Sequence, residues 1–555
     1  KGLAVLFAGV LLSGTFYIMS VDNSLFGQAV GKQIDNGSDM GTFTPTDKPN
    51  APMGVARGIH PGRVAWAHDP QAAVWDGKHG LYSDADNNSQ TRVCDMMEGV
   101  IISLTHQKTI DRAWDELFRT FNKKKGKGAT GYKEGEKIAE ILVEEQEPSA
   151  PCDEIINAVG CYLLPGVIDD HVHFRDPGLT HKADICTESR AAAAGGVTSI
   201  MDMPNTNPQT TTLEALNEKL DLMAEKCSVN YSCYFGATNN NYLLMGQLDK
   251  HRVCGIKLFM GSSTGNMLVD KMTSLLNIFN STDLLIAAHC EDQAIIKENT
   301  AKYLEEYGVD GDVPLKYHPA IRSTEACYQS SELAIRLARI ADARLHILHV
   351  STSKELQLFE NIPLSEKRIT SEACIAHLLY NSNDYQTLGT RIKCNPAIKL
   401  KERNALRDGV NSGLIDVIGT DHAPHLLREK EGGALKATSG MPMIQFSLVS
   451  MLELVDEGVF TLEKVVEKMC HAPAEIYEIH NRGYIRKGNQ ADLVLVRPDT
   501  EWTVTNDCIL SKCKWSPLEG HTFHWKVEKT FANGHLLYSD ETIDENYRGQ
   551  ELRFL

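Results

Sequence analysis

The chain lacks paired cysteines. None of its 14 cysteines forms a CxxC pair or stands at a spacing from histidine that is typical of a structural zinc site. All but Cys94 follow Ala150, and they are scattered singly. This pattern excludes a disulfide framework and indicates buried thiols in a reducing compartment, so it predicts a cytoplasmic location for most of the chain.

The chain has fewer basic than acidic residues. The 56 Lys and Arg residues face 73 Asp and Glu residues, a net charge of −17, whereas a nucleic-acid-binding protein would carry a basic surface. We therefore expect no nucleic-acid partner. With 42% hydrophobic and 23% charged residues, the composition excludes a wholly disordered or polytopic membrane protein. At about 150 residues per domain, 555 residues predict three or four domain-sized units.

Only one long apolar run occurs, at Leu3–Met19, and it contains no charge. It is short and interrupted by Gly and Ser, which makes it more typical of a secretory signal than of a spanning helix. We interpret residues 1–20 as a signal or anchor, which would allow export or membrane contact through residues 3–19 and conflicts with the cytoplasmic prediction. A buried helix is the alternative.

Residues 21–136 have an irregular composition, rich in Gly, Asn, Asp and Pro. Apolar periodicity is weak before an expected amphipathic helix at 114–121. The basic run at 123–128 is not followed by the Gly-Lys-Ser/Thr of a phosphate-binding loop. The segment resembles the opening of an uncharacterised family of exported bacterial proteins that often carry iron–sulfur cysteines, but no such cysteines follow. Its function cannot be predicted.

After Lys137, short Val- and Ile-rich runs alternate with helical patterns, which is typical of strand–helix units around a parallel sheet. Eight such strands predict an α/β fold, a closed (β/α)8 TIM barrel over residues 163–475. The tail at 476–555 contains hairpin patterns, including an Asn533–Gly534 turn, and predicts a small second sheet. The expected barrel strands are 163–168, 197–203, 231–236, 253–259, 284–288, 345–350, 368–373 and 416–420.

Polar groups follow six of the predicted strands. His171 and His173 are two residues apart, so both imidazoles can reach one metal ion. Lys257 lies between apolar residues, where an unpaired ammonium would be costly. Each group alone has an ordinary structural explanation, but together, at the end of a barrel where active sites lie, they predict metal-dependent catalysis. The remaining groups are Arg175, Asn205, His289, His346, His349, Asp421, His422 and His425.

The motifs HVHFRDPG, MDMPNTNP, GIKLFMGSS, AHCED, ILHVST and GTDHAPH resemble those of the amidohydrolase superfamily, and within it the dihydroorotases. The resemblance runs from about residue 137 to residue 555. It implies a (β/α)8 barrel with a small β-sandwich and two zinc ions per subunit. Proteins of this type often form dimers or tetramers, so a homo-oligomer is compatible with the resemblance.

By this resemblance, His171, His173 and Asp421 would hold the first zinc ion. The two ions would lower the pKa of a bridging water, and the resulting hydroxide would attack the ring amide carbonyl of dihydroorotate. Asp421 would take the proton of the hydroxide and deliver it to the departing ring nitrogen. The reverse reaction would cyclise N-carbamoyl-L-aspartate, as in the de novo biosynthesis of UMP.

The second zinc ion would be held by His289 and His349. Lys257 resembles the lysine that family members carboxylate with CO2, which gives a carbamate that bridges the two metals. This modification would also remove the cost of the buried ammonium, because the carbamate is anionic and metal-bound.

A clamp for the substrate carboxylate is also implied. Arg175 would form it together with Asn205 and His425, because the planar guanidinium can donate two hydrogen bonds to a carboxylate. Asn395 resembles a position that lines the pocket, and the stretch 439–443 would line it too. We interpret His346 and His422 as structural or as partners of the ligands.

Two alternatives remain open. Allantoinases and hydantoinases or dihydropyrimidinases share the metal set but act on rings without this carboxylate, so Arg175 and His425 favour dihydroorotase. A non-catalytic scaffold with the same fold would typically lose metal ligands, and here every candidate is retained.

The chain departs from the family before the barrel. Family members begin with further sandwich strands, but here only residues 137–162 stand in that place. We interpret them as a remnant and predict an incomplete sandwich, in which the C-terminal hairpins lack partners and leave unpaired edges and exposed apolar surface. A smaller departure is Ala376 before His377, where family members more often have two histidines, and this affects no ligand.

Overall fold

The computed structural model describes residues 137–142, 155–261 and 266–555, together with a few residues between 102 and 119. The predictions for 1–20, and nearly all of those for 21–136, lie outside the described residues. Glu136–Leu555 belong to one compact unit, which is the one described below. Within the described part of the chain, no helix has the length and apolar character needed to cross a membrane.

The core of this unit is a ring of parallel strands. The segment 230–236 is one strand interrupted at Tyr234, because its first part, β4, pairs with β3 and its second part, β5, pairs with β6. A parallel bridge between Val172 and His422 connects β10 back to β2. The predicted TIM barrel is therefore confirmed. Its strands are β2 (Val167–Val172), β3 (Val197–Asp202), β4 (Asn230–Cys233), β5 (Phe235–Gly236), β6 (Ile256–Phe259), β7 (Ile286–His289), β8 (Leu345–Ile347), β9 (Ile369–Cys374) and β10 (Val417–Gly419).

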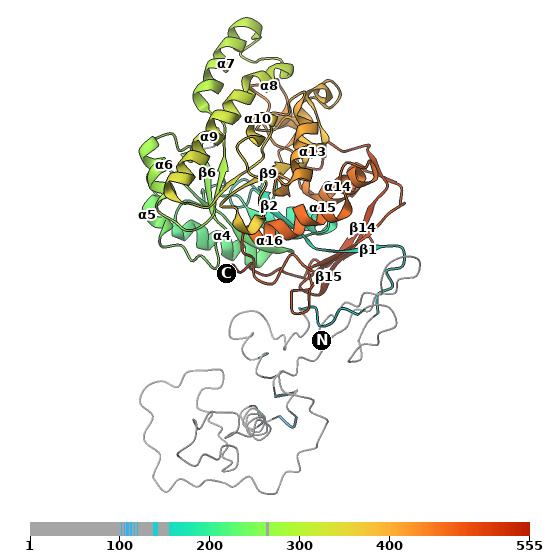
Figure 1. The fold of residues 1–555 in the computed structure, drawn as a ribbon. Helices are drawn as coiled ribbons and strands as arrows, with labels where there is room; N and C mark the ends of the chain where they lie inside the picture. The colour runs from blue at the N-terminus through green and yellow to red at the C-terminus, as the bar shows by residue number, and fades with distance from the viewer. Residues whose placement is uncertain are drawn as a thin grey trace, which may run out of the picture. The chain divides into compact units, whose positions relative to one another are not determined.

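Helices surround these strands (Figure 1). Their starts follow from local sequence, since the side chains of Asp184, Thr212 and Ser323 each accept a hydrogen bond from a backbone N–H in the first turn. The helices are α3 (Ile185–Ala194), α4 (Leu213–Lys226), α5 (Tyr242–Met245), α6 (Met272–Phe279), α7 (Gln293–Tyr307), α8 (His318–Ile321), α9 (Thr324–Ala341), α10 (Ser353–Leu356), α11 (Ile375–Leu379), α12 (Tyr385–Leu388), α13 (Glu402–Ser412), α14 (Ser447–Asp456), α15 (Leu462–Val466) and α16 (Ala472–Ile476).

The first predicted strand, 163–168, spans two strands of different sheets. Its first residues belong to β1 (Tyr162–Pro165), and its last belong to β2 of the barrel. The chain passes from one to the other at Gly166, where an added Cβ would lie 2.2 Å from the Thr198 side chain. The sequence does not reveal this break, because the residues on both sides of it are apolar and buried and the run contains no clear turn signal.

A second, antiparallel sheet has the order β1-β11-β14-β15-β16. The predicted turn at Asn533–Gly534 joins β14 to β15, and both of its residues have positive φ, as a type I′ turn requires. Two short strands between β11 and β14 in the sequence, β12 and β13, form a separate two-stranded sheet. The strands are β11 (Leu493–Arg497), β12 (Trp502–Thr503), β13 (Thr522–Phe523), β14 (Lys526–Ala532), β15 (His535–Ser539) and β16 (Thr542–Ile543).

The prediction that the C-terminal strands lack partners is wrong for β11. Strand β1 pairs along it, with Leu163 opposite Leu495, and Ile138 is buried in the same apolar cluster. The error arose because the YLLP residues were assigned to the barrel. Apolar exposure does remain beside β1, where Ile155 is 53% and Val159 45% exposed.

Candidate metal-dependent active site

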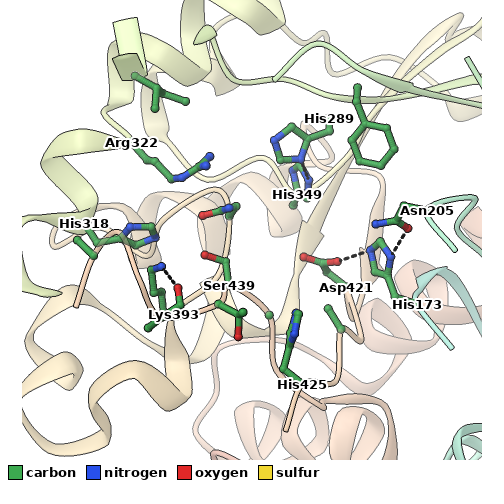
Figure 2. A pocket seen from close by; sticks show the side chains of 18 of the residues that line it. His173, Asn205, His289, His318, Arg322, His349, Lys393, Asp421, His425 and Ser439 are labelled. Carbon is green, nitrogen blue, oxygen red and sulfur yellow. Dashed lines mark hydrogen bonds and ion pairs between the residues drawn. The ribbon is translucent and has the colours of Figure 1, made fainter. Parts of the chain in front are cut away.

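The ten residues predicted to bind metal or substrate line one cavity of about 570 Å³ at the carboxyl ends of the barrel strands (Figure 2). The parallel strands bring them together from distant parts of the sequence, because every strand ends at the same rim. These residues are His171, His173, Arg175, Asn205, Lys257, His289, His349, Asn395, Asp421 and His425. Of the predicted stretch 439–443, Ser439 and Gly440 line it.

Three of these side chains converge on one point. Nε2 of His171 and Nε2 of His173 lie 3.3 Å and 3.1 Å from Oδ1 of Asp421. One ligand atom from each of the three lies within 4.8 Å of the others. Two imidazoles and a carboxylate are ligands that zinc prefers, so this donor set fits a metal ion.

A second pair lies beside the first. Nδ1 of His289 lies 2.8 Å from Nε2 of His349, so these two nitrogens can face a common cation. Lys257, on the neighbouring strand β6, places its Nζ 4.7 Å from the centroid of the Phe259 ring. Burial lowers the pKa of Lys257 to about 8. No ion pair among the described residues neutralises it, which fits a lysine that becomes modified or binds a metal.

The electrostatics favour the metal-binding form of most of these groups. The exception is His171, because burial would lower its pKa but the carboxylates of Glu372 and Asp421 outweigh burial and raise it. Burial lowers the pKa of His173 to about 3 and also lowers the pKa of His289 and His349, so these imidazoles stay neutral. Burial would raise the pKa of Asp421, but His171 and His173 outweigh it and hold that pKa below its usual range. Asp421 is therefore a carboxylate near neutral pH.

In three of the candidate ligand histidines, the ring nitrogen that points away from the other ligands has a hydrogen-bond partner. Nδ1 of His171 lies 3.1 Å and 3.2 Å from the two oxygens of Glu372. Nδ1 of His173 donates to Oδ1 of Asn205 across 2.8 Å. Partners of this kind fix the ring orientation and the tautomer of a metal ligand. Asn205, predicted to bind substrate, thus also supports His173.

Glu291 plays the same part for His289. Its Oε2 lies 2.9 Å from Nε2 of His289, and Arg322 forms an ion pair with the same carboxylate oxygen. The sequence prediction missed Glu291, Glu372 and Arg322. A carboxylate two residues after a strand histidine, as in AHCED, was the available signal for Glu291.

The predicted clamp lies in the same cavity, with Arg175 placed just after β2 and His425 in the segment after β10. Nη2 of Arg175 lies 3.2 Å from Nε2 of His425, and its Nε donates to the Pro424 carbonyl. Arg175 is only 7% exposed. Oδ1 of Asn395 is buried and accepts no hydrogen bond from the described residues, so it is available to a ligand in the cavity.

Three site residues have left-handed backbone conformations. The φ angles of Arg175, His349 and Asp421 are 66°, 40° and 46°. Such conformations cost on the order of 1–3 kcal/mol each in non-glycine residues and cluster at functional sites. Here each follows a barrel strand and turns the chain where its side chain enters the cavity.

The cavity also contains residues that strand-end reasoning did not predict. His318, Arg322 and Lys393 lie on the side away from His173 (Figure 2). Conversely, His346 and His422 do not line the cavity: Nδ1 of His346 bonds Thr370, and Nε2 of His422 lies 2.8 Å from Glu188.

Comparisons with known proteins agree with this geometry. The Amidohydrolase family matches residues 162–537. A dihydroorotase from Methanosphaera stadtmanae is 31% identical over 73% of this chain and 90% of its own length. An allantoinase from Bacillus velezensis is 30% identical over 70% of this chain and 86% of its own. The structure of an L-hydantoinase from Arthrobacter aurescens superposes with a TM-score of 0.70 at 26% identity, covering 74% of this chain and 94% of that one.

Proposed function

The chain belongs to the amidohydrolase family, and from this we propose that it is a dihydroorotase, a hydrolase of cyclic amides that interconverts (S)-dihydroorotate and N-carbamoyl-L-aspartate. One observation carries the choice of substrate. The buried guanidinium of Arg175 and the ring of His425 lie together in the cavity that contains the metal-ligand set. A substrate with a carboxylate beside its reacting amide matches this arrangement.

We propose that the candidate ligands hold two zinc ions. His171, His173 and Asp421 would hold one, and His289 and His349 the other. Lys257 would react as the neutral amine with CO2, forming an N–C bond and losing a proton, and the resulting carbamate would supply a further anionic ligand. When bound, the metal ions would activate water as the nucleophile and polarise the amide carbonyl.

Asp421 moves the proton. Its carboxylate is ionised and belongs to the first metal-ligand cluster, so it can accept a proton from the attacking water. In the same position it can deliver that proton to the departing ring nitrogen. In the cyclisation direction it would take the proton from the ureido nitrogen.

Arg175, His425 and Asn395 bind and orient the ring. The guanidinium donates to the substrate carboxylate in a fixed planar geometry, and the low dielectric of the buried site strengthens that interaction. Oδ1 of Asn395 can accept from a ring N–H. These contacts hold the amide carbonyl towards the metal-ligand cluster.

Hydantoinase or allantoinase activity is the second candidate, because an L-hydantoinase superposes on the barrel and an allantoinase is similar in sequence. Neither hydantoin nor allantoin carries the ring carboxylate that Arg175 would bind. A non-catalytic scaffold is disfavoured by the retained ligand set.

The cysteines of the described residues are free, which supports the proposal that the barrel works in the cytoplasm.

The test uses the full chain. We expect about two zinc ions per chain and turnover of dihydroorotate well above that of hydantoin or allantoin. Arg175→Met should raise KM for dihydroorotate while zinc content stays at the wild-type level. Turnover of hydantoin or allantoin alone would overturn the proposed substrate, and absence of bound metal in a folded protein would favour the scaffold.

A further inference from the structure

His425 lies between two cationic side chains. Its Nε2 is 3.2 Å from Nη2 of Arg175, and its Nδ1 is 3.1 Å from Nζ of Lys182. The side chain of His425 is 12% exposed and that of Lys182 is 15% exposed, so solvent screens this arrangement only weakly.

Both neighbours can only donate. Neither a guanidinium nor an ammonium group has a lone pair for hydrogen bonding, whereas a neutral imidazole accepts at one nitrogen and donates at the other. In either tautomer, only one of the two contacts of His425 is therefore a hydrogen bond. An imidazolium is disfavoured, because burial and the flanking cations Arg175 and Lys182 lower the pKa of His425.

No carboxylate among the described residues is close enough to accept a proton from Nδ1. Lys182 is held in place by Glu429, whose Oε1 lies 3.0 Å from Nζ. The other Glu429 oxygen accepts from the Leu426 backbone N–H and is 3.7 Å from Nδ1 of His425, too far to accept a hydrogen bond from it. Nδ1 of His425 therefore has Lys182 as its hydrogen-bond partner. Because the Lys182 ammonium can only donate, Nδ1 must be the acceptor in this hydrogen bond.

Position and tautomer are controlled separately. Nε1 of Trp515 donates to the His425 carbonyl across 2.7 Å and fixes the main chain. Nε of Arg175 donates to the Pro424 carbonyl, so the Nη hydrogens of the planar guanidinium remain available to a ligand. Removing the Lys182 amine would therefore leave the place of His425 unchanged and alter which of its nitrogens carries the proton.

We propose that Lys182 is a positioning residue that fixes the tautomer of His425, so that Nε2–H donates to the carboxylate of the substrate beside Arg175. The inference rests on the proposed function and adds a residue to its carboxylate clamp. Without Lys182, Nε2 would accept from Arg175. His425 would then present a lone pair to the carboxylate and occupy one of the guanidinium donors.

The test compares Lys182→Met with Lys182→Arg. In the first variant, KM for dihydroorotate should rise ~10- to 100-fold, the effect of losing a hydrogen bond to a charged group, while kcat changes little. The inhibition constant of 5,6-dihydrouracil, the same ring without the carboxylate, should stay within about twofold of wild type if only the carboxylate contact is lost. Lys182→Arg retains a donor and should restore most of the affinity.

The matched control is Lys512→Met, which removes an ion pair with Asp184 but does not touch His425. It should leave both constants unchanged. Unchanged KM in Lys182→Met, or equal losses for dihydroorotate and dihydrouracil, would overturn the inference while the proposed function stands. A wild-type enzyme that hydrolyses hydantoin or allantoin but not dihydroorotate would overturn both.

Discussion

Oε2 of Glu291 lies 2.9 Å from Nε2 of His289, and neither side chain is more than 6% exposed. The carboxylate accepts the Nε2 proton, so Nδ1 of His289 keeps its lone pair towards His349 and the cavity. Burial would raise the pKa of Glu291, but Arg322 and His289 outweigh it and lower that pKa to about 2. The partner of this ligand is therefore ionised throughout the working pH range.

Glu291→Gln should weaken metal binding. The amide is neutral and can present its NH2 group to the histidine, so the correct tautomer of His289 is no longer enforced. Loss of such a partner typically lowers metal affinity or activity about 10- to 100-fold. Competition with a chelator of known zinc affinity measures the change.

Glu453→Gln provides the control. Glu453 also bonds a histidine, His521, across 2.8 Å, but this pair does not line the cavity. Zinc affinity should be unchanged in it. If Glu291→Gln retained wild-type affinity, the hydrogen bond to His289 would not contribute to metal binding.

Asp421→Asn should remove most of the activity. The side chain keeps its shape and an oxygen ligand but can no longer accept a proton, so kcat should fall by about 10²- to 10⁴-fold, the usual contribution of a general base. Steady-state kinetics together with zinc analysis separates this effect from loss of metal. A variant that holds zinc and retains near wild-type kcat would exclude Asp421 as the proton carrier.

The strand-end residues could be predicted from the sequence because position along a parallel strand determines which rim a side chain reaches. His171, Lys257, His289 and Asp421 are far apart in the chain, yet the barrel brings all of them to one cavity. The same rule could not distinguish His346 from His349. In the folded protein His349 has a positive φ and lines the cavity, whereas His346, within β8, does not line it.

The partners of these residues could not be predicted in the same way. Arg322 meets Glu291, and Lys182 meets His425, through loops and helices whose course depends on tertiary packing. The predicted N-terminal boundary of the barrel was wrong for a different reason. The run around Gly166 is apolar in both sheets, so hydrophobicity alone does not reveal where one strand ends.

Ile138→Ala should destabilise the second sheet. Ile138 is 1% exposed, and its backbone is bonded to residues 488 and 489 of the C-terminal part. Truncation of a buried isoleucine costs about 2–5 kcal/mol. Denaturant unfolding measures the loss. Ile155→Ala, the same substitution at a side chain that is 53% exposed, should change stability by less than about 0.5 kcal/mol. Equal effects would show that residues 137–142 do not pack on this sheet.

The pair of His521 and Glu453 should make stability depend on pH. The hydrogen bond to Glu453 raises the pKa of His521 in the folded state. Its stabilisation is therefore fully present below the unfolded pKa of about 6.5 and is lost as the pH rises through the folded value. The effect should be below about 1 kcal/mol, because the His521 side chain is 42% exposed.

Thermal unfolding of His521→Gln and wild type at pH 5.5 and pH 8.5 tests this sign. The variant should unfold at a lower temperature than wild type at pH 5.5, and the difference should shrink at pH 8.5, where the imidazole is neutral in both states. His524→Gln is the matched control, since His524 lies 4.0 Å from the same carboxylate and forms no hydrogen bond with it. A difference that grew with pH would mean that the neutral ring, not the charged one, is stabilised by Glu453.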